Sequence, residues 1–152
     1  MNTKKNLSKF FNRTLLFSLG NTSTQTHTRT INPKFGLFGL LGFTGFLGFI
    51  PHLESISYAT FFFVFFGFFG FYYEGKMSNT LMDERFISNR YRADALAHKI
   101  ALNLIFIATI CFIEKFSSVE SLCHFLLGLI GIALALDGFL QQYLLYRFEN
   151  EE

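Results

Sequence analysis

The chain has 152 residues, a length typical of one domain. Apolar side chains make up 51% of the sequence, phenylalanine alone fills 23 positions, and the formal net charge is only +2. The 13 cations are too few, and too closely tied to apolar segments, to indicate nucleic-acid binding. The composition therefore excludes a strongly basic nucleic-acid-binding protein and points to a chain whose solvent is lipid.

Four apolar runs account for this composition. They cover Phe35–Ile50, Tyr58–Tyr73, Ile100–Ile113 and Leu122–Leu136. Each is shorter than the roughly 20 residues that cross a hydrocarbon core of about 30 Å, so flanking residues must complete a span. Four buried helices of a soluble protein are the alternative, but the polar residues lie almost entirely in the connections and leave no water-facing side. We therefore predict an all-α integral membrane protein, with a four-helix bundle over residues 34–147 in the bilayer of the plasma membrane.

Residues 1–33 form a basic segment ahead of the first apolar run. The segment contains five cations and no acid. Apolar side chains recur at helical spacing within residues 4–19, which favours a short amphipathic helix on the membrane surface. A mitochondrial targeting segment is the alternative, while the apolar stretch is too short for a signal peptide. Residues 21–32 are Thr-rich and aperiodic, which predicts a flexible linker.

Glycine recurs at every third position of the first apolar run. Pro33 suits the first turn of a helix, which should end before Pro51. At about 100° per residue in an α-helix, a row of every third residue winds around the axis instead of forming one face. Such a row leaves a slanted groove into which phenylalanines of the second helix can pack; a groove for a cofactor or substrate is the alternative. The predicted packing glycines of this hairpin are Gly36, Gly39, Gly42, Gly45, Gly48, Gly67 and Gly70.

The connection formed by residues 74–92 is the most polar part of the chain. Residues 80–83 resemble a capping box with aspartate in place of the usual glutamate or glutamine, which predicts a helix over about residues 81–113. Arg90 and Asp94 have the spacing of an ion pair on that helix. We expect the first third of this helix to extend into the cytoplasm and to carry the candidate partner-binding residues. These are Asp83, Glu84, Arg85, Arg90 and Arg92.

Small residues recur along the third and fourth predicted helices. Ala93, Ala97 and Ala101 are spaced by fours on the third helix. The matching small residues of the fourth helix are Gly128, Gly131, Ala135 and Gly138. In lipid such stripes let two helix backbones approach closely, so we expect these two helices to pack through them.

Asp137 interrupts the fourth apolar run, and an acid inside a membrane is a functional hypothesis by default. His98 on the third helix has a similar depth, but Asp137 lies opposite the small-residue stripe of its own helix. This placement predicts that Asp137 does not face the third helix and is an interfacial acid. A buried acid paired with His98, with Lys99 or with a second subunit is the alternative. The intramembrane polar candidates are Asp137, His98, Lys99 and Asn103.

The distribution of cations predicts the orientation. Residues 1–34 carry six Lys or Arg, residues 74–99 carry five, and the tail carries one, whereas the two other connections share only Lys115. By the positive-inside rule, both termini and the central connection are cytoplasmic. The tail, residues 148–152, is acidic and is expected to fray.

The sequence contains no recognisable catalytic motif. Nucleophile-elbow, zinc-protease and P-loop patterns are all absent from it. Cys123 and His124 supply at most two metal ligands, too few for a zinc site. Cys111 and Cys123 share a depth and are interpreted as small apolar residues, with a disulfide in an oxidising exterior as the alternative. We therefore expect no enzyme activity, no cofactor and no metal.

Three stretches resemble a known family. They are the Gly-Phe triplets after Asn32-Pro33-Lys34, the segment FFGFFGFYYEGK, and Asp83-Glu84-Arg85 followed by NRYRA. Over about residues 32–147 the chain resembles small prokaryotic multi-pass membrane proteins grouped as domain of unknown function 3796. The resemblance implies no established activity. Members of that group are often encoded near small helix-turn-helix regulators, which implies a regulatory partnership.

Two hypotheses of function follow from the residues. The leading one is a non-enzymatic membrane protein that binds a cytoplasmic or membrane protein partner through residues 74–92, because the distinctive polar side chains gather there. The rival is a small transporter or channel subunit that uses Asp137. Four helices of this length cannot enclose a pathway alone, so the rival requires a homo-oligomer. An intramembrane enzyme ranks third, since no nucleophile with a neighbouring base is apparent.

Overall fold

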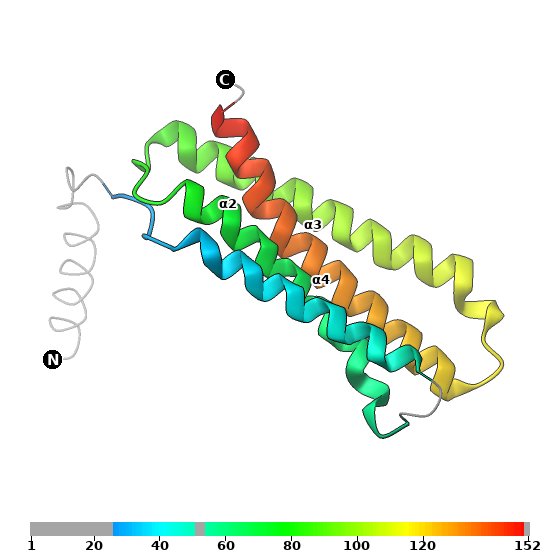
Figure 1. The fold of residues 1–152 in the computed structure, drawn as a ribbon. Coiled ribbons are helices and arrows are strands. Elements are labelled where there is room, and N and C mark those ends of the chain that lie inside the picture. Colours follow the sequence, from blue (N-terminus) through cyan, green and yellow to red (C-terminus); the bar gives the residue numbers. More distant parts are fainter. Residues whose placement is uncertain (1–25, 51–53, 151–152) are drawn as a thin grey trace, which may run out of the picture.

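A computed structural model describes residues 26–50 and 54–150 of the chain. It contains η1 (Pro33–Phe49), η2 (Glu54–Phe69), α2 (Gly70–Lys76), α3 (Glu84–Phe112), η3 (Ile113–Lys115) and α4 (Val119–Asn150). Within the described ranges there is no strand, only an isolated bridge between His27 and Leu81. The prediction of an all-α fold with four long helical segments is therefore confirmed (Figure 1). The surface helix predicted for residues 4–19 lies outside the described residues.

The first two helical segments are 3-10 helices, which the α-helical interpretation of the glycine row did not anticipate. η1 has 17 residues and η2 has 16, and α2 continues directly from η2. Runs of this kind longer than three or four residues are uncommon, because the hydrogen-bond geometry is poorer than in an α-helix. A 3-10 helix has three residues per turn, so residues i and i+3 eclipse one another. The glycine row of η1 therefore forms a straight stripe along one face, and the prediction that it winds around the helix is wrong.

The matching period of η2 explains why this geometry is favoured here. Phe63, Phe66 and Phe69 also recur at every third position, and their rings stack on one another with centroids 6.0 and 6.1 Å apart. A straight ladder of rings on η2 therefore faces a straight stripe without side chains on η1. An α-helical period of 3.6 residues would take both rows out of register within two turns.

The two rows meet one to one in an antiparallel zipper. A Cβ atom built on Gly39 would lie 2.7 Å from the ring of Phe69, and one built on Gly42 would lie 2.5 Å from the ring of Phe66. The remaining pairs of this zipper are Gly36 with Tyr72, Gly45 with Phe63, and Gly48 with Thr60. Phenylalanine-into-glycine packing was expected for this hairpin, and the eclipsed geometry gives it a fixed register.

Gly67 and Gly70 belong to a different contact from the one predicted. They face α4, where a Cβ on Gly67 would lie 3.2 Å from the Cα of Ala135 and one on Gly70 would lie 2.8 Å from the carbonyl oxygen of Gly138. Gly131 likewise approaches the backbone of η2, with 2.9 Å from its Cβ position to the Phe61 oxygen. The small-residue stripe of α4 therefore packs against η2 and α2, and its predicted contact with α3 is wrong.

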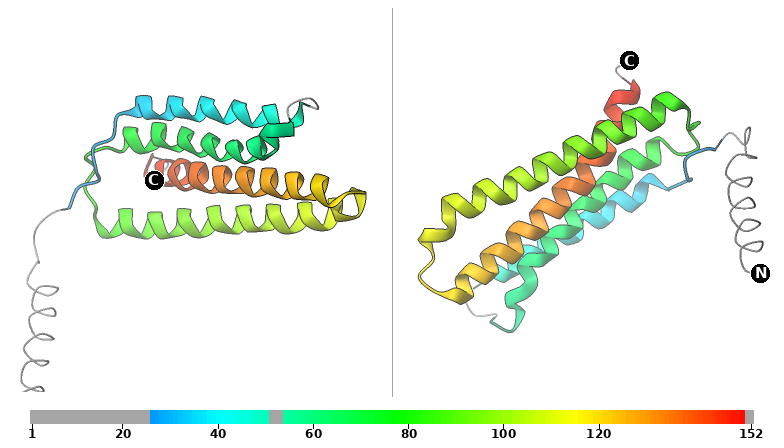
Figure 2. Two further views of the ribbon diagram at one scale, coloured as in Figure 1. Left: turned by 90° about the horizontal axis from the view of Figure 1, so that it is seen from below. Right: turned by 180° about the vertical axis from the view of Figure 1, so that it is seen from behind.

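The long segments lie side by side in an open row and do not close into the predicted bundle. Their order is η1, then η2 with α2, then α4, then α3, and η1 makes no extensive contact with α3 or α4. Figure 2 shows this row from below, with η1 and α3 at its two edges. The buried alanines of α3, Ala93, Ala97 and Ala101, therefore lie on a helix that packs mainly against α4, and Ala93 also joins Met77 of the central connection in one apolar cluster. The predicted all-α class holds, but the bundle geometry is corrected.

The helix termini differ from the predicted ones. Asp83 is the N-cap of α3, because its side chain accepts a hydrogen bond of 2.7 Å from the backbone N–H of Phe86. The helix consequently begins at Glu84, and the capping box predicted at residues 80–83 is not formed. α4 runs to Asn150, and Glu149 accepts a hydrogen bond from Asn89 of α3. The prediction of a frayed tail is therefore wrong for the residues as far as Asn150.

Two helices of the described chain are long and apolar enough to cross a membrane. They are Glu84–Lys115 and Val119–Asn150, each of 32 residues. η1 is apolar but shorter. Large apolar side chains such as Phe49, Phe106 and Leu102 are more than 60% exposed, as expected for helices that are solvated by lipid.

Candidate functional site

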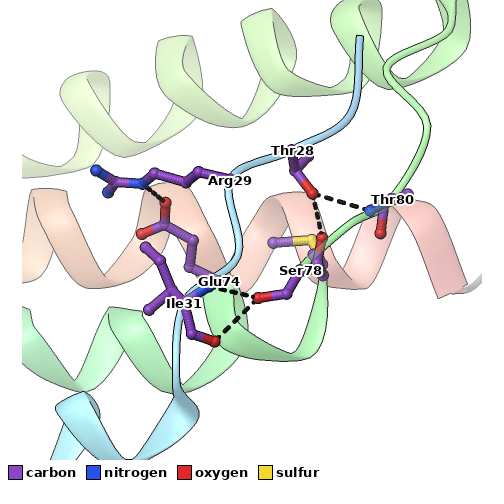
Figure 3. Close-up of polar contacts among 7 residues, drawn as sticks. Thr28, Arg29, Ile31, Glu74, Ser78 and Thr80 are labelled. Atoms are coloured by element: carbon purple, nitrogen blue, oxygen red, sulfur yellow. Dashed lines mark hydrogen bonds and ion pairs between the residues drawn. The ribbon is translucent and has the colours of Figure 1, made fainter. Parts of the chain in front are cut away.

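Residues 26–32, here called the strap, lie across the turn that joins α2 to α3 (Figure 3). The backbone N–H of Thr28 donates to the Thr80 oxygen at 2.9 Å, and that of Met82 donates to the Thr26 oxygen at 2.8 Å. Ser78 closes a second link, because its hydroxyl accepts from the Ile31 N–H at 2.9 Å and donates to the Ile31 oxygen at 3.0 Å. The described part of the predicted flexible linker is therefore fixed to the central connection.

An ion pair joins the strap to α2. Arg29 Nε donates to Glu74 Oε1 at 2.7 Å. The hydrogen bond that Arg29 donates to Glu74, and then the charge of Glu74, raise the pKa of Arg29, so the guanidinium is charged at every physiological pH. The pair is exposed on the arginine side, and exposed pairs of this kind contribute little to stability. Its consequence is geometric: it fixes the strap as one wall of a cavity.

This cavity lies between the strap, α2, α3 and α4, and has a volume of about 440 Å³. Its floor is apolar and buried, with Met77, Phe86 and Leu145 each less than 10% exposed. Charged and amide side chains surround that floor. They are Arg29, Glu74, Arg90, Asp94, Gln141 and Gln142. The cavity thus combines an apolar base with groups of both signs.

Most predicted partner-binding residues contact the chain itself. Asp83 caps α3. Arg85 pairs with Glu149 at 3.3 Å, and the guanidinium of Arg92 lies over the Phe148 ring at 4.6 Å from its centroid. These contacts join the first turns of α3 to the last turns of α4. The predicted set is thus brought to one end of the molecule, but three of its members have structural roles there.

The two other members of that set are differently placed. Glu84 is exposed in the first turn of α3. Arg90 lines the cavity, as does Asp94, and neither has an ion pair within the described part of the chain. The ion pair predicted between Arg90 and Asp94 is therefore not formed.

Asp137 faces α3, contrary to the prediction. His98 Nδ1 lies 3.1 Å from Asp137 Oδ1, and Gln141 Nε2 donates to Asp137 Oδ2 at 3.0 Å. Oδ1 is buried and accepts no aligned hydrogen bond from the described residues, so its contact with His98 is a close approach without a formed hydrogen bond. Asp137 does lie opposite the small-residue stripe of α4, but that stripe faces η2, which turns Asp137 towards α3.

The remaining candidates are not drawn into this cluster. Lys99 and Asn103 are exposed, and the structure gives neither a polar partner among the residues it describes. Cys111 and Cys123 are free thiols on the exposed surface, so the alternative of a disulfide between them is not realised. Among residues 26–50 and 54–150, no group of His, Cys, Asp and Glu is close enough to hold a metal ion.

Sequence reasoning missed the cavity itself. The amides Gln141 and Gln142 and the spacing of Arg90 and Asp94 were visible signals of a polar helix face. The strap gave no such signal, because its contacts with the central connection join residues 45 to 56 positions apart.

No family model, no curated protein and no solved structure matches the chain. The resemblance to the group called domain of unknown function 3796 therefore stays a prediction.

Proposed function

We propose that the chain is a non-enzymatic membrane protein with four spans and both termini in the cytoplasm, which acts as an interaction or regulatory partner through residues 74–92. The main support is the separation of chemistry along the helices. Large apolar side chains are exposed along η1 and α3, whereas the strap, the cavity and the contacts of Glu149 gather at one end. Polar groups concentrated outside a lipid-facing region are typical of a membrane protein that binds its partner at the surface.

The geometry of η1 supports a full span despite its length. A 3-10 helix rises about 2.0 Å per residue, so the 17 residues of η1 extend roughly 34 Å. The same residues in an α-helix would extend only roughly 26 Å. The hydrocarbon core is about 30 Å thick, so the extended form reaches across it and the α-helical form does not. η2 followed by α2 is longer still.

A tyrosine cluster supports the position of the inner membrane interface. Tyr73 contacts the rings of Tyr143 and Tyr146 at 5.3 and 5.4 Å, and Lys76 lies 4.6 Å from the centroid of Tyr72. A hydrogen bond with Tyr72 raises the pKa of Lys76, which keeps the ammonium charged beside the rings. Tyrosine and lysine are enriched where helices leave the bilayer, and the cation-rich side of a membrane protein faces the cytoplasm.

Capture of a partner protein tests this proposal. The tagged protein is isolated in mild detergent, and its partners are quantified for the wild type, for the double variant Glu84→Ala with Arg90→Ala, and for Glu120→Ala. The double variant should lose most of the captured partner, because these two side chains are charged and not committed to contacts within the described chain. Glu120, in the first turn of α4 at the other end of the row, should be without effect. Equal capture by all three proteins, each equally folded, would contradict the proposal.

A small oligomeric transporter or channel subunit is a second candidate, favoured by one observation. Asp137 Oδ1 is buried without an aligned hydrogen bond, which costs folding free energy. An acid that is kept inside a membrane at such a cost favours a functional role. Uptake into proteoliposomes under a proton gradient separates the candidates. A transporter requires flux in the wild type that is lost in Asp137→Asn, whereas the binding function predicts no proton-linked flux in either protein.

A further inference from the structure

The cavity at the end of the molecule has the size and construction of a ligand site. Its volume of about 440 Å³ falls within the range of roughly 300–1,000 Å³ that is typical of small-molecule sites. Such sites combine apolar walls with a few polar groups that fix the orientation of the ligand. Here Phe86 and Leu145 form the base at 2% and 5% exposure, and four elements contribute the walls.

The charges of the cavity fall into two classes. Arg29 and Glu74 are paired with each other at 2.7 Å and so compensate one another. Arg90 and Asp94 line the same cavity, yet the described chain gives neither an ion pair. They lie four residues apart on one helix, with the cation on the N-terminal side, and this order is the weaker one for a pair within a helix. A ligand that binds both side chains therefore has no strong ion pair between them to break.

We infer that the cavity binds a small amphiphilic zwitterion, whose anionic group pairs with Arg90 and whose ammonium group pairs with Asp94. A ligand with one charge would pair with only one of these two side chains. The planar guanidinium of arginine binds carboxylate or phosphate oxygens through two parallel hydrogen bonds. Gln141 and Gln142 offer further donors and acceptors, and the apolar body of the ligand lies against Phe86 and Leu145.

Two sources can supply this chemistry. One is a soluble apolar α-amino acid, and the other is the phosphoethanolamine headgroup of a membrane lipid. Both carry an ammonium group within a few bonds of an anionic group. The inference shares Arg90 with the proposed partner-binding surface, but it is tested by binding of small molecules, so its failure and the failure of partner capture are separate results.

Calorimetric titration of the full-length protein in detergent micelles tests the inference. The probes are L-leucine, its analogues N-acetyl-L-leucine and L-leucinamide, and glycerophosphoethanolamine. We expect saturable binding of at least one zwitterion, and at least tenfold weaker binding of both leucine analogues if leucine is the one bound. Tighter binding of leucine assigns a soluble ligand, and tighter binding of glycerophosphoethanolamine assigns a lipid headgroup. No saturable binding of either, or equal binding of leucine and its two analogues, would overturn the inference.

Three variants test the residues. Asp94→Asn should weaken binding of the zwitterion at least tenfold and remove the discrimination against the analogue without an ammonium group. Arg90→Gln should also weaken binding of the zwitterion at least tenfold, and it should remove the discrimination against the analogue without a carboxylate. Glu120→Gln is the matched control, since Glu120 is an exposed carboxylate in the first turn of α4 and does not line the cavity. Unchanged affinity in both cavity variants would overturn the assignment, and if Arg90→Gln fails to fold, Asp94→Asn and the analogues decide it.

Discussion

Glu149 joins the end of α4 to the start of α3 through a single carboxylate. One oxygen accepts from the Asn89 amide at 2.8 Å, and the other pairs with Arg85 at 3.3 Å. The two partners differ in burial, because Asn89 is only 7% exposed whereas the Arg85 side chain is 53% exposed. A buried donor that loses its acceptor is costly, while an exposed ion pair contributes little. The hydrogen bond to Asn89 should therefore dominate.

We predict that Glu149→Ala lowers the free energy of unfolding by about 1–3 kcal/mol, the usual cost of leaving a buried polar group unpaired. Arg85→Ala should cost less than about 1 kcal/mol, since its pair with Glu149 is largely solvated. Thermal unfolding in detergent, followed by circular dichroism, measures both. Glu114→Ala is the control, because Glu114 is exposed in η3. A loss in Glu149→Ala no larger than in the control would contradict this account of the helix junction.

Asp137 shows how far residue-scale prediction reaches. Its level beside His98 and its position opposite the glycines of α4 follow from the helical period, and the structure confirms both. Which helix packs against each face depends on the tertiary structure. A stripe of small residues indicates close packing but does not identify the partner helix. Here Gly131 and Gly138 meet η2 and α2, so Asp137 meets His98 on α3.

At the scale of elements, the glycine zipper should tolerate a methyl group at some positions only. A Cβ on Gly42 would lie 2.5 Å from the Phe66 ring, which is itself confined between Phe63 and Phe69. A Cβ on Gly138 would have no neighbour closer than the Gly67 Cα at 4.0 Å. The first position has no space for alanine, whereas the second does.

We predict that Gly42→Ala costs about 1–3 kcal/mol, the usual penalty for overpacking. Gly138→Ala is the matched control and should change stability by no more than about 1 kcal/mol, with the higher helix propensity of alanine in its favour. Thermal unfolding in detergent compares them, and a double-mutant cycle with Phe66→Ala tests the pair. Equal effects of the two alanines, or no coupling between residues 42 and 66, would contradict the zipper register.

The 3-10 geometry of η1 makes a prediction about distance. Leu37 and Phe49 are 64% and 68% exposed and are twelve residues apart, which is four full turns of a 3-10 helix. Their backbones should lie roughly 24 Å apart at about 2.0 Å per residue. An α-helix would place them roughly 18 Å apart and on different faces. Spin labels at these positions, in a background with Cys111→Ser and Cys123→Ser, allow the distance to be measured by pulsed electron spin resonance.

An internal standard removes the contribution of the label itself. Ile87 and Lys99 have the same twelve-residue separation on α3, which is α-helical, and both are exposed. The η1 distance should exceed the α3 distance by roughly 6 Å, the difference in rise over twelve residues. Equal distances would show that η1 is an α-helix in the detergent-solubilised protein.

The cause of the 3-10 geometry is present in the sequence but cannot be recognised from one segment. The three-residue period of glycine and phenylalanine is visible in the order of residues, but an α-helix is the default because its hydrogen bonds are better aligned. The 3-10 form is favoured only when two rows of equal period face each other, as Gly39 faces Phe69 and Gly45 faces Phe63. That condition involves both helices, so no single segment predicts it.

At the scale of the whole molecule, the two edge helices of the open row, η1 and α3, differ in the contacts that hold them. η1 contacts η2 and α2, and its outer end at the strap is tied to the central connection. α3 packs mainly against α4, with the Glu149 junction at one end. In lipid the exposed sides of both edge helices are solvated, so a row needs no central core to be stable. The same row in water would expose a large apolar surface.

The topology of this row is the remaining prediction, and it depends on the length of η1. Paired reporters, one active only outside the cell and one fluorescent only in the cytoplasm, are fused after Glu54, Gly75, Ser118 and Glu152. Four spans predict a cytoplasmic signal after Gly75 and Glu152 and an exterior signal after Glu54 and Ser118, because Lys and Arg are concentrated on the first side. If only the two longest helices cross the bilayer, Ser118 stays exterior but Glu54 reports the cytoplasm, as Gly75 does. The signal at Glu54 therefore decides whether 17 residues, extended to roughly 34 Å by the 3-10 rise, form a span. A cytoplasmic signal at Ser118 would contradict both arrangements, whereas an exterior signal at Glu54 and Ser118 together is the outcome that we expect.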